Sequence, residues 1–273
     1  MSIRLIASDV DGTILPRGGK ISDRTRAAVH ACEAAGIHFV IASGRWYVSA
    51  RTIADCLEME QGYMIISGGG AVVRMDGTPL MQWRMFRAQA ERVYEIARRE
   101  NVMINAFVPD AVYRVNTAAL RQPVRGLGDY LGGQYHMVND DRTLFEEKGL
   151  ECPYKMEVYG EDAQTLAALR EMLVREGLTV TSSFHTNLEI LAPGCGKGTA
   201  LKWLMRDLGI EPEACMAFGD NGNDLSLLQA SGWPVAVGNA VDALKRVARR
   251  VAGNCECDGV AEVIEQVIGG NFV

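Results

Sequence analysis

The sequence has no apolar run long enough to cross a membrane. A membrane helix needs about 18 or more consecutive apolar residues, and polar residues interrupt every apolar run of this chain before that length. We therefore expect no membrane span and no membrane partner. A signal peptide is not expected either, because Asp9 and Asp11 come too early to leave room for its apolar segment.

Positive charge is also scarce. Lys and Arg together number 28, Asp and Glu number 34, and the formal net charge is −6 at pH 7. Proteins that hold nucleic acid through its phosphates need a basic surface, so we expect no nucleic acid partner. A small anionic substrate is compatible with this composition, because a few local cations suffice to bind it.

Cysteine and histidine are not spaced to hold a metal. The seven cysteines are scattered through apolar runs, and the pair Cys255 and Cys257 lacks both zinc-site spacing and a second pair. The four histidines show no metal spacing either. An odd number of scattered cysteines predicts buried, reduced thiols and a cytoplasmic location.

The chain is long enough for two domains and apolar enough to bury their cores. It has 273 residues, of which 48% are hydrophobic and 23% charged, and domains commonly have about 150 residues. At both ends of the chain, buried strand patterns alternate with helix patterns. Strands are expected at 3–8, 37–42, 63–67 and 215–219, and helices at 22–35, 46–57, 223–230, 240–248 and 258–268. Parallel strands joined by helices predict a doubly wound α/β sheet.

The middle of the chain is less regular. A strand is expected at 154–160, and Leu166, Leu169 and Leu173 mark a helix by their spacing. We interpret residues 1–83 and 188–273 as one doubly wound α/β core. Residues 84–187 are interpreted as a smaller inserted α/β domain.

Four polar stretches follow expected strands or open an expected helix. They are Asp9 with Asp11 after the first strand, Ser43-Gly44-Arg45 after the second, GDNGND (219–224) at the end of the strand at 215–219, and Lys197 at a helix start. Ligands of an open parallel sheet bind beyond the carboxyl ends of its strands. All four stretches are therefore expected at one edge of the sheet.

Each stretch taken alone has a plainer explanation. Asp-x-Asp-Gly can be a simple turn, Ser-Gly-Arg can cap a helix, and a lysine at a helix start is commonly solvated. GDNGND does not fit a calcium loop, because Gly222 and Leu225 stand where an oxygen ligand and a glycine are needed. GCGKGT does not fit a nucleotide P-loop, because Leu191 and Gly198 replace the required glycine and hydroxyl residue.

Together the four stretches supply the groups of a metal and phosphate site. Asp9, Asp11 and Asp220, with Asp224 nearby, form a set of oxygen ligands that suits Mg²⁺. A lysine, a serine hydroxyl and glycine-rich backbone complement a phosphate. A divalent cation would also explain how two like charges, one residue apart, can lie side by side after the first strand.

These residues resemble the four motifs of the haloacid dehalogenase (HAD) superfamily of phosphatases. DVDGT (9–13), SGR (43–45), GKGTAL (196–201) and GDNGNDLSLL (219–228) occur in the order of that family. The tail AVGNAVDALKRVA, followed by DGVAEVI, is similar to that of its Cof-like sugar-phosphatase branch. The resemblance implies a Rossmann-like core and a C2-type cap that selects the substrate, inserted between the second and third motifs.

The resemblance also implies a role for each site residue. Asp9 would be the nucleophile that forms an aspartyl-phosphate, and Asp11 would protonate the leaving oxygen and later activate water. Mg²⁺ is expected at the Asp9 side chain, the Asp11 backbone carbonyl and Asp220, with Asp224 in support. The expected phosphate-binding residues are Ser43, Gly44, Lys197 and Asn223. The expected function is Mg²⁺-dependent hydrolysis of phosphomonoesters of small metabolites, sugar phosphates in particular.

One position departs from the family. Where the family usually has Asn-Gly-Ala after the third strand, this chain has Gly69-Gly70-Ala71. The missing amide is expected to have faced the substrate or the cap, so the departure bears on the substrate and not on phosphoryl transfer.

Two other functions are compatible with the same motifs. A phosphomutase would return the phosphoryl group to a sugar, and its cap would need several cations around a second phosphate. The candidates for that role are Arg114, Arg121, Arg125 and Lys155. A non-catalytic metabolite-binding protein would be expected to lack the nucleophile or the acid, and this chain has both.

Overall fold

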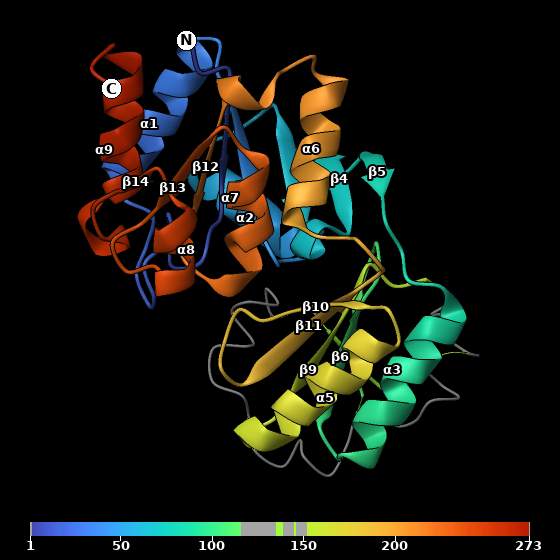
Figure 1. Ribbon diagram of the computed structural model, residues 1–273. Helices are drawn as coiled ribbons and strands as arrows, with labels where there is room; N and C mark the ends of the chain where they lie inside the picture. The colour runs from blue at the N-terminus through green and yellow to red at the C-terminus, as the bar shows by residue number, and fades with distance from the viewer. Residues whose placement is uncertain (1, 116–134, 139–144, 146–151, 273) are drawn as a thin grey trace.

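The computed structural model describes residues 2–115, 135–138, 145 and 152–272. These residues form two α/β units, which lie one above the other in the view of Figure 1. The two ends of the chain together build the larger unit, which we call the core, and the middle of the chain builds the inserted domain. Within the described ranges, no helix is able to span a membrane.

The described strands of the core form one eight-stranded sheet in the order β14-β13-β12-β1-β2-β3-β4-β5. They are β1 (Leu5–Ser8), β2 (His38–Ala42), β3 (Tyr63–Ile66), β4 (Ala71–Arg74), β5 (Pro79–Gln82), β12 (Cys215–Gly219), β13 (Trp233–Ala236) and β14 (Arg250–Val251). Neighbours from β14 to β3 are parallel, and β4 and β5 extend the sheet in antiparallel fashion.

Helices cover both faces of the core sheet (Figure 1). They are α1 (Asp23–Ala34), α2 (Tyr47–Cys56), α6 (Lys197–Asp207), α7 (Leu225–Ala230), α8 (Asp242–Val247) and α9 (Gly259–Ile268). Helix α1 packs beside α9, and α6 packs beside α7. Ser22 caps α1, because its hydroxyl oxygen accepts a hydrogen bond from the Thr25 backbone N–H at 3.0 Å. The doubly wound α/β core expected from the sequence is confirmed.

The inserted domain has its own sheet, in the order β10-β11-β9-β6-β7-β8. Its described strands are β6 (Met103–Phe107), β7 (Val112–Val115), β8 (His136–Val138), β9 (Lys155–Tyr159), β10 (Thr179–Thr181) and β11 (Asn187–Leu191). Helices α3 (Arg87–Arg99) and α5 (Ala163–Arg175) lie side by side against it. The leucines at 166, 169 and 173 are buried on α5, as their spacing predicted.

The end of the inserted domain differs from the range of 84–187 that the sequence suggested. Strand β11 pairs with β9 along its whole length and with β10 over residues 189–191, and it continues the inserted sheet to Leu191. An apolar run such as NLEIL predicts a buried strand but does not say which sheet that strand joins. Arg121 and Arg125, two of the candidate cations for a second phosphate, lie outside the described residues.

An apolar cluster joins the core to the inserted domain. Trp46, which precedes α2 in the core, is 3% exposed and packs with Met103, Phe107, Val112 and Tyr159 of the inserted domain. The loop that follows β2 is therefore in contact with both domains. This contact holds the inserted domain against the edge of the core sheet where the polar stretches lie.

Candidate active site

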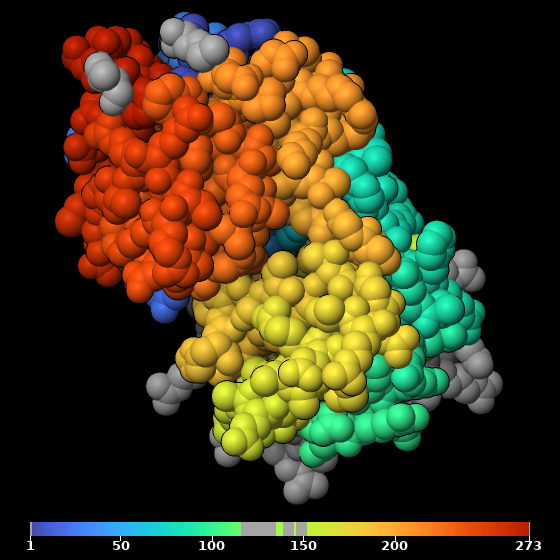
Figure 2. Space-filling model, in the orientation of Figure 1, coloured from blue at the N-terminus to red at the C-terminus, as the bar shows by residue number. Residues whose placement is uncertain are grey.

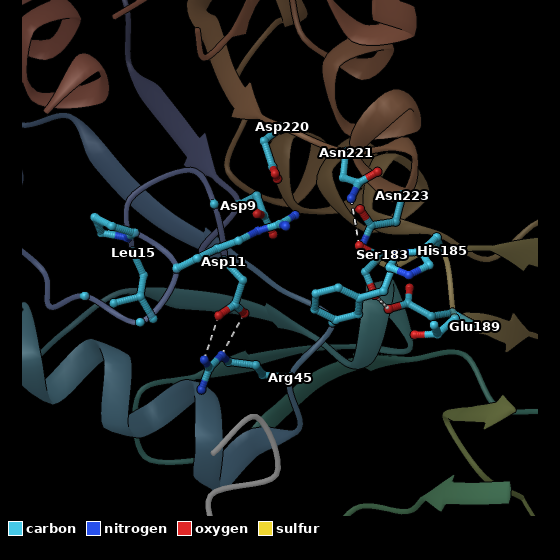
Figure 3. A pocket seen from close by; sticks show the side chains of 18 of the residues that line it. Asp9, Asp11, Leu15, Arg45, Ser183, His185, Glu189, Asp220, Asn221 and Asn223 are labelled. Carbon is cyan, nitrogen blue, oxygen red and sulfur yellow. Dashed lines mark hydrogen bonds and ion pairs between the residues drawn. The ribbon is translucent and has the colours of Figure 1, made fainter. Parts of the chain in front are cut away.

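The structure brings the polar stretches together where the strands of the core sheet end (Figure 3). Asp9 follows β1, Asp220 follows β12, and Lys197 is the first residue of α6. The Lys197 Nζ lies 2.6 Å from Asp9 Oδ1 and 2.6 Å from Asp224 Oδ1. A buried lysine thus links two parts of the chain that are more than two hundred residues apart in sequence.

Asp224 supports its neighbours through both of its carboxylate oxygens. Its Oδ1 accepts the hydrogen bond from Lys197, and its Oδ2 accepts the backbone N–H groups of Asp220 and Asn221, both at 3.1 Å. Because Asp224 is fully buried, these bonds fix where Asp220 and Lys197 stand. Asp224 therefore positions Asp220 and Lys197 and does not itself line the cavity.

Gly12 allows the turn after β1 to approach Asp220 closely. Its φ is +87°, a left-handed conformation that favours glycine. A β-carbon at this position would lie 2.4 Å from Asp220 Oδ2, which is closer than atoms can pack. The glycine of the DVDGT motif is therefore required both by the backbone conformation and by the space beside the carboxylate.

Carboxylates are in excess at this site. Burial, with Asp224 next to it, raises the pKa of Asp9 well above its ordinary value, against the opposing effect of Lys197. Burial and Asp224 likewise raise the pKa of Asp220 to about 7. Burial alone would lower the pKa of Lys197, but Asp224 and Asp9 raise it overall. One ammonium group does not balance the carboxylates around it, so the site favours an additional cation.

The site can offer three oxygen ligands to a cation. Asp9, Asp220 and Asp224 each place one carboxylate oxygen within 4.8 Å of the other two. Hard divalent cations such as Mg²⁺ prefer oxygen ligands, and Mg²⁺ uses only a few protein carboxylates. The residues present thus fit a Mg²⁺ ion by the chemistry of their donor atoms and by the charge that they leave unbalanced.

Asp11 stands apart from this buried cluster. Its carboxylate accepts two hydrogen bonds from the guanidinium of Arg45, from Nε at 2.9 Å and from Nη2 at 2.7 Å (Figure 3). Arg45 also donates from Nη1 to Ser49 Oγ at 2.8 Å. The Asp11 side chain is 34% exposed, so it faces the space above the cluster. The site residues expected from the sequence do not include Arg45, although it is the last residue of the SGR motif.

The expected phosphate-binding residues lie around the same point. Ser43 is buried after β2, and its Oγ accepts the Arg45 backbone N–H at 3.1 Å. Gly44 and Asn223 line the cavity next to Asp9, whereas Lys197 is buried behind it.

A cavity of about 640 Å³ opens between the core and the inserted domain, and Figure 2 shows the surface hollowed between them. The core contributes Asp9, Asp11, Gly44, Asp220 and Asn223 and the loop from Leu15 to Gly19. The inserted domain contributes Tyr159, Glu189 and the loop of residues 183–186. Asn221 Nδ2 donates to the Ser183 carbonyl at 2.7 Å, so this loop is tied to the core.

Sequence reasoning did not find the residues that the inserted domain contributes. Phe184 and His185 are at the tip of the β10–β11 hairpin and line the cavity, where His185 is seen in Figure 3. A loop between two short strands carries no periodic signal, and nothing in its sequence shows that it faces another domain. A cavity of this size, with one polar end, accommodates a small metabolite.

Comparison with known proteins identifies the family. Residues 6–264 match the model of the haloacid dehalogenase-like hydrolases. The chain belongs to this family. The resemblance inferred from the motifs is confirmed, and the protein is an enzyme, a hydrolase of phosphoric monoesters.

Known relatives match this HAD-like hydrolase over almost its full length. The HMP-PP phosphatase of Yersinia pestis is 30% identical over 96% of this chain and 94% of its own. The 5-amino-6-(5-phospho-D-ribitylamino)uracil phosphatase of Bacillus subtilis is 26% identical over 97% of this chain and 95% of its own. The structure of a haloacid dehalogenase-like hydrolase from B. subtilis has a TM-score of 0.87 at 25% identity, covering 96% of this chain and 99% of that one.

The departure from the family at Gly69 has a local cause in this HAD-like hydrolase. Gly69 has a φ of +103°, and a β-carbon there would lie 2.2 Å from the carbonyl carbon of Gly196. The sequence led us to expect that the missing amide had faced the substrate or the cap. In this structure the side-chain direction at position 69 points at the backbone that leads into Lys197, so the glycine serves close backbone packing.

Proposed function

We propose that this HAD-like hydrolase is a Mg²⁺-dependent phosphatase that hydrolyses phosphomonoesters of small metabolites, sugar phosphates among them, through an aspartyl-phosphate on Asp9. The observation that carries the proposal is the buried cluster of Asp9, Lys197, Asp220 and Asp224, of which Asp9 and Asp220 line the cavity. It combines a nucleophilic carboxylate, a cation for phosphoryl oxygens and a site for a metal ion at one point.

We assign the metal to the Asp9 side chain, the Asp11 backbone carbonyl and Asp220. Asp224 would support them, since its two oxygens already hold Lys197 and the backbone of residues 220 and 221. When bound, Mg²⁺ supplies charge neutralisation, which lets an anionic carboxylate approach an anionic phosphate.

Each site residue has a separate role in the two steps of the reaction. The Asp9 carboxylate attacks phosphorus and forms the acyl-phosphate bond as the bond to the leaving oxygen breaks, and Asp11 gives that oxygen a proton. Asp11 then takes a proton from the water that attacks the aspartyl-phosphate, which releases phosphate and restores Asp9. Lys197, Ser43, the Gly44 backbone and Asn223 hold the phosphoryl oxygens during both steps.

Asp11 has to leave Arg45 before it can serve as the acid. Both of its oxygens accept hydrogen bonds from the Arg45 guanidinium in this structure. A carboxylate in that position cannot donate a proton to a leaving oxygen. The Asp11 side chain is partly exposed above the cluster, so a change of rotamer can carry it toward the substrate.

The charges of the inserted domain favour hydrolysis over a phosphomutase reaction, in which the cap would have to bind a second phosphate. Its described residues that line the cavity are Tyr159, Ser183, Phe184, His185, Thr186 and Glu189, with no lysine or arginine among them. Of the cations considered for a phosphomutase, Lys155 is paired with Glu157, and Arg114 donates to Asn105 at 3.0 Å. We therefore infer an uncharged leaving group with hydroxyl groups, and a cap role for the inserted domain.

The relatives support the same class of substrate. The B. subtilis relative is named as a phosphatase of a phosphoribitylamino compound, which is a phosphomonoester of a small hydroxylated metabolite. A reducing compartment such as the cytoplasm suits the protein, because all seven of its cysteines are free thiols.

A screen of phosphorylated metabolites tests the proposal. Purified protein with Mg²⁺ should release inorganic phosphate from a subset of sugar and polyol phosphates, and the Asp9→Asn variant should release none. Hexose 1-phosphate should yield free phosphate and no hexose 6-phosphate. Formation of the 6-phosphate would support the phosphomutase, and the absence of any turnover over the whole panel would support a binding protein.

A further inference from the structure

A fully buried ion pair lies where the inserted domain meets the core. Lys155 and Glu157 of β9 and Glu189 of β11 each have 0% exposure. Lys155 Nζ lies 2.6 Å from Glu157 Oε1 and 3.8 Å from Glu189 Oε1. Removing charges from water costs several kcal/mol per ion unless their partners are well placed, so stability alone does not account for this arrangement.

Each of the two carboxylates has further partners that hold it in place. Tyr159 donates its hydroxyl proton to Glu157 Oε2 at 2.7 Å. Ser183 and Thr181 donate to the two oxygens of Glu189, at 2.6 and 3.2 Å. The ammonium of Lys155 also lies 4.4 Å from the centre of the Phe107 ring. Lys155 is therefore held by a rigid set of groups from its own domain.

The same ammonium reaches into the core. Lys155 Nζ donates to the Gly44 carbonyl oxygen at 2.7 Å, a contact between the inserted domain and the loop of the SGR motif. The Gly44 carbonyl and the Arg45 N–H belong to one planar peptide unit, so fixing the carbonyl fixes the direction of the N–H. That N–H donates to Ser43 Oγ at 3.1 Å.

The orientation of Ser43 is thereby tied to Lys155. A serine hydroxyl that accepts one hydrogen bond still has its own proton to donate. With its oxygen held by the Arg45 N–H, Ser43 can direct that proton toward a phosphoryl oxygen. The Gly44 N–H is a second backbone donor of this loop, and it is joined through the Gly44 α-carbon to the peptide unit that Lys155 holds.

We propose that Lys155 is a positioning residue, which couples the docking of the inserted domain to the order of the phosphate-binding loop at Ser43 and Gly44. The proposal rests on the proposed function, because it assigns that loop to the phosphoryl group. Lys155 does not touch the substrate. It acts through the Gly44 carbonyl. The loop is therefore ordered for phosphate binding when the inserted domain is docked on the core.

The test separates this role from simple charge balance. Lys155→Met keeps the length of the side chain and removes the ammonium, which leaves Glu157 buried without its cation. We therefore compare Glu157→Gln with Glu157→Gln/Lys155→Met, two variants that differ only in Lys155. Tyr159 can still donate to the amide oxygen at position 157 in both. The measurements are Tm, kcat/KM for p-nitrophenyl phosphate, and the affinity for inorganic phosphate by calorimetry with Mg²⁺.

We expect the double variant to remain folded, with a Tm lowered by the loss of the cation beside Glu189, and to have a kcat/KM and phosphate affinity at least about tenfold below those of Glu157→Gln. Tenfold is the size of one charge-assisted hydrogen bond. Equal kcat/KM and equal phosphate affinity in the two variants would overturn the proposal, because Lys155 would then only balance the charge of Glu157.

Two other results can be distinguished from a failure of this proposal: a double variant that does not fold, and a wild-type protein without phosphatase activity. If the double variant does not fold, the same comparison is made in the Glu157→Gln/Glu189→Gln background, in which Lys155→Met leaves no charge of the network behind. If the wild-type protein hydrolyses no phosphomonoester, the proposed function fails, and the phosphate affinities alone decide for or against Lys155.

Discussion

Replacing Asp11 with asparagine separates proton transfer from every other role of the site. The Asp11 side chain does not contact Lys197, Asp9 or Asp224 in this structure, and its partner is Arg45. Asparagine has the same shape and keeps the backbone carbonyl that we assign to the metal. The amide oxygen of asparagine can still accept a hydrogen bond from Arg45, and Arg45 keeps its own hydrogen bond to Ser49 Oγ. Because Asp11 is 34% exposed but the Arg45 side chain only 9%, we expect a loss of unfolding free energy of about 1–3 kcal/mol.

The expected loss of rate is larger and depends on the leaving group. General acid catalysis is typically worth about 10²–10⁴ in rate, which is roughly 3–5 kcal/mol of activation free energy. A sugar alkoxide leaves poorly without a proton, so hexose phosphates should show most of this loss. p-Nitrophenolate leaves without a proton, so the attack by Asp9 on its phosphate should be much less affected.

The assay follows phosphoenzyme as well as turnover. We expect Asp11→Asn to accumulate aspartyl-phosphate after mixing with p-nitrophenyl phosphate, because the water that hydrolyses it has lost its base. Intact mass of the quenched protein measures this species, and Asp9→Asn is the matched control that should never form it. Equal losses of rate on aryl and sugar phosphates, with no phosphorylated protein, would refute proton transfer by Asp11.

Four other outcomes follow from the site. Excess chelator should abolish turnover, and Ca²⁺ should inhibit it, because Ca²⁺ accepts bidentate carboxylates and would occupy both oxygens of the nucleophile; full activity in chelator would contradict the metal site. Lys197→Ala should lower kcat/KM on the order of 10²-fold on every substrate, and a change only in the ranking of substrates would contradict its role. Gly12→Ala should weaken Mg²⁺ binding through the overlap with Asp220, whereas Gly36→Ala, also at positive φ but with nothing within 4 Å, should not, as calorimetry can show. In chelator, thermal stability should fall as pH rises from about 4 to about 7, since the folded pKa of Asp220, about 7, lies above its ordinary 3.8 and the native state holds the proton longer; a Tm that rises over this range would contradict the raised pKa.

The edge of the core sheet could be predicted because local rules determine it. Each polar stretch directly follows a strand or opens a helix, and parallel strands bring their carboxyl ends to one side. Their positions after strands or at a helix start therefore predict that Asp9, Lys197 and Asp220 lie at one edge of the core sheet. The hydrogen-bonded ion pair of Asp11 and Arg45 could not be predicted in this way, because it depends on side-chain rotamers in two loops.

The role of Lys155 could not be predicted from its strand. In β9, Lys155, Glu157 and Tyr159 alternate with Met156 and Val158, a pattern that usually means one buried face and one solvated face. All five residues are buried, because the polar face meets the core instead of water. The sequence suggested Lys155 as a cation for a second phosphate, and the structure pairs it with Glu157. Period-two patterns show which residues share a face, and not what covers that face.

The loop after β2 connects the two proposals. Ser43 and Gly44 are assigned to the phosphoryl group, Arg45 holds the acid Asp11, and Trp46 is buried among residues of the inserted domain. These four residues are consecutive, so a displacement of the inserted domain that moves Trp46 or frees the Gly44 carbonyl must also move the partner of Asp11. If Lys155 orders this loop, its loss should therefore weaken phosphate binding and acid placement together. A variant that lost only phosphate affinity, with an unchanged ratio of rates on sugar and aryl phosphates, would show that the two ends of the loop move independently.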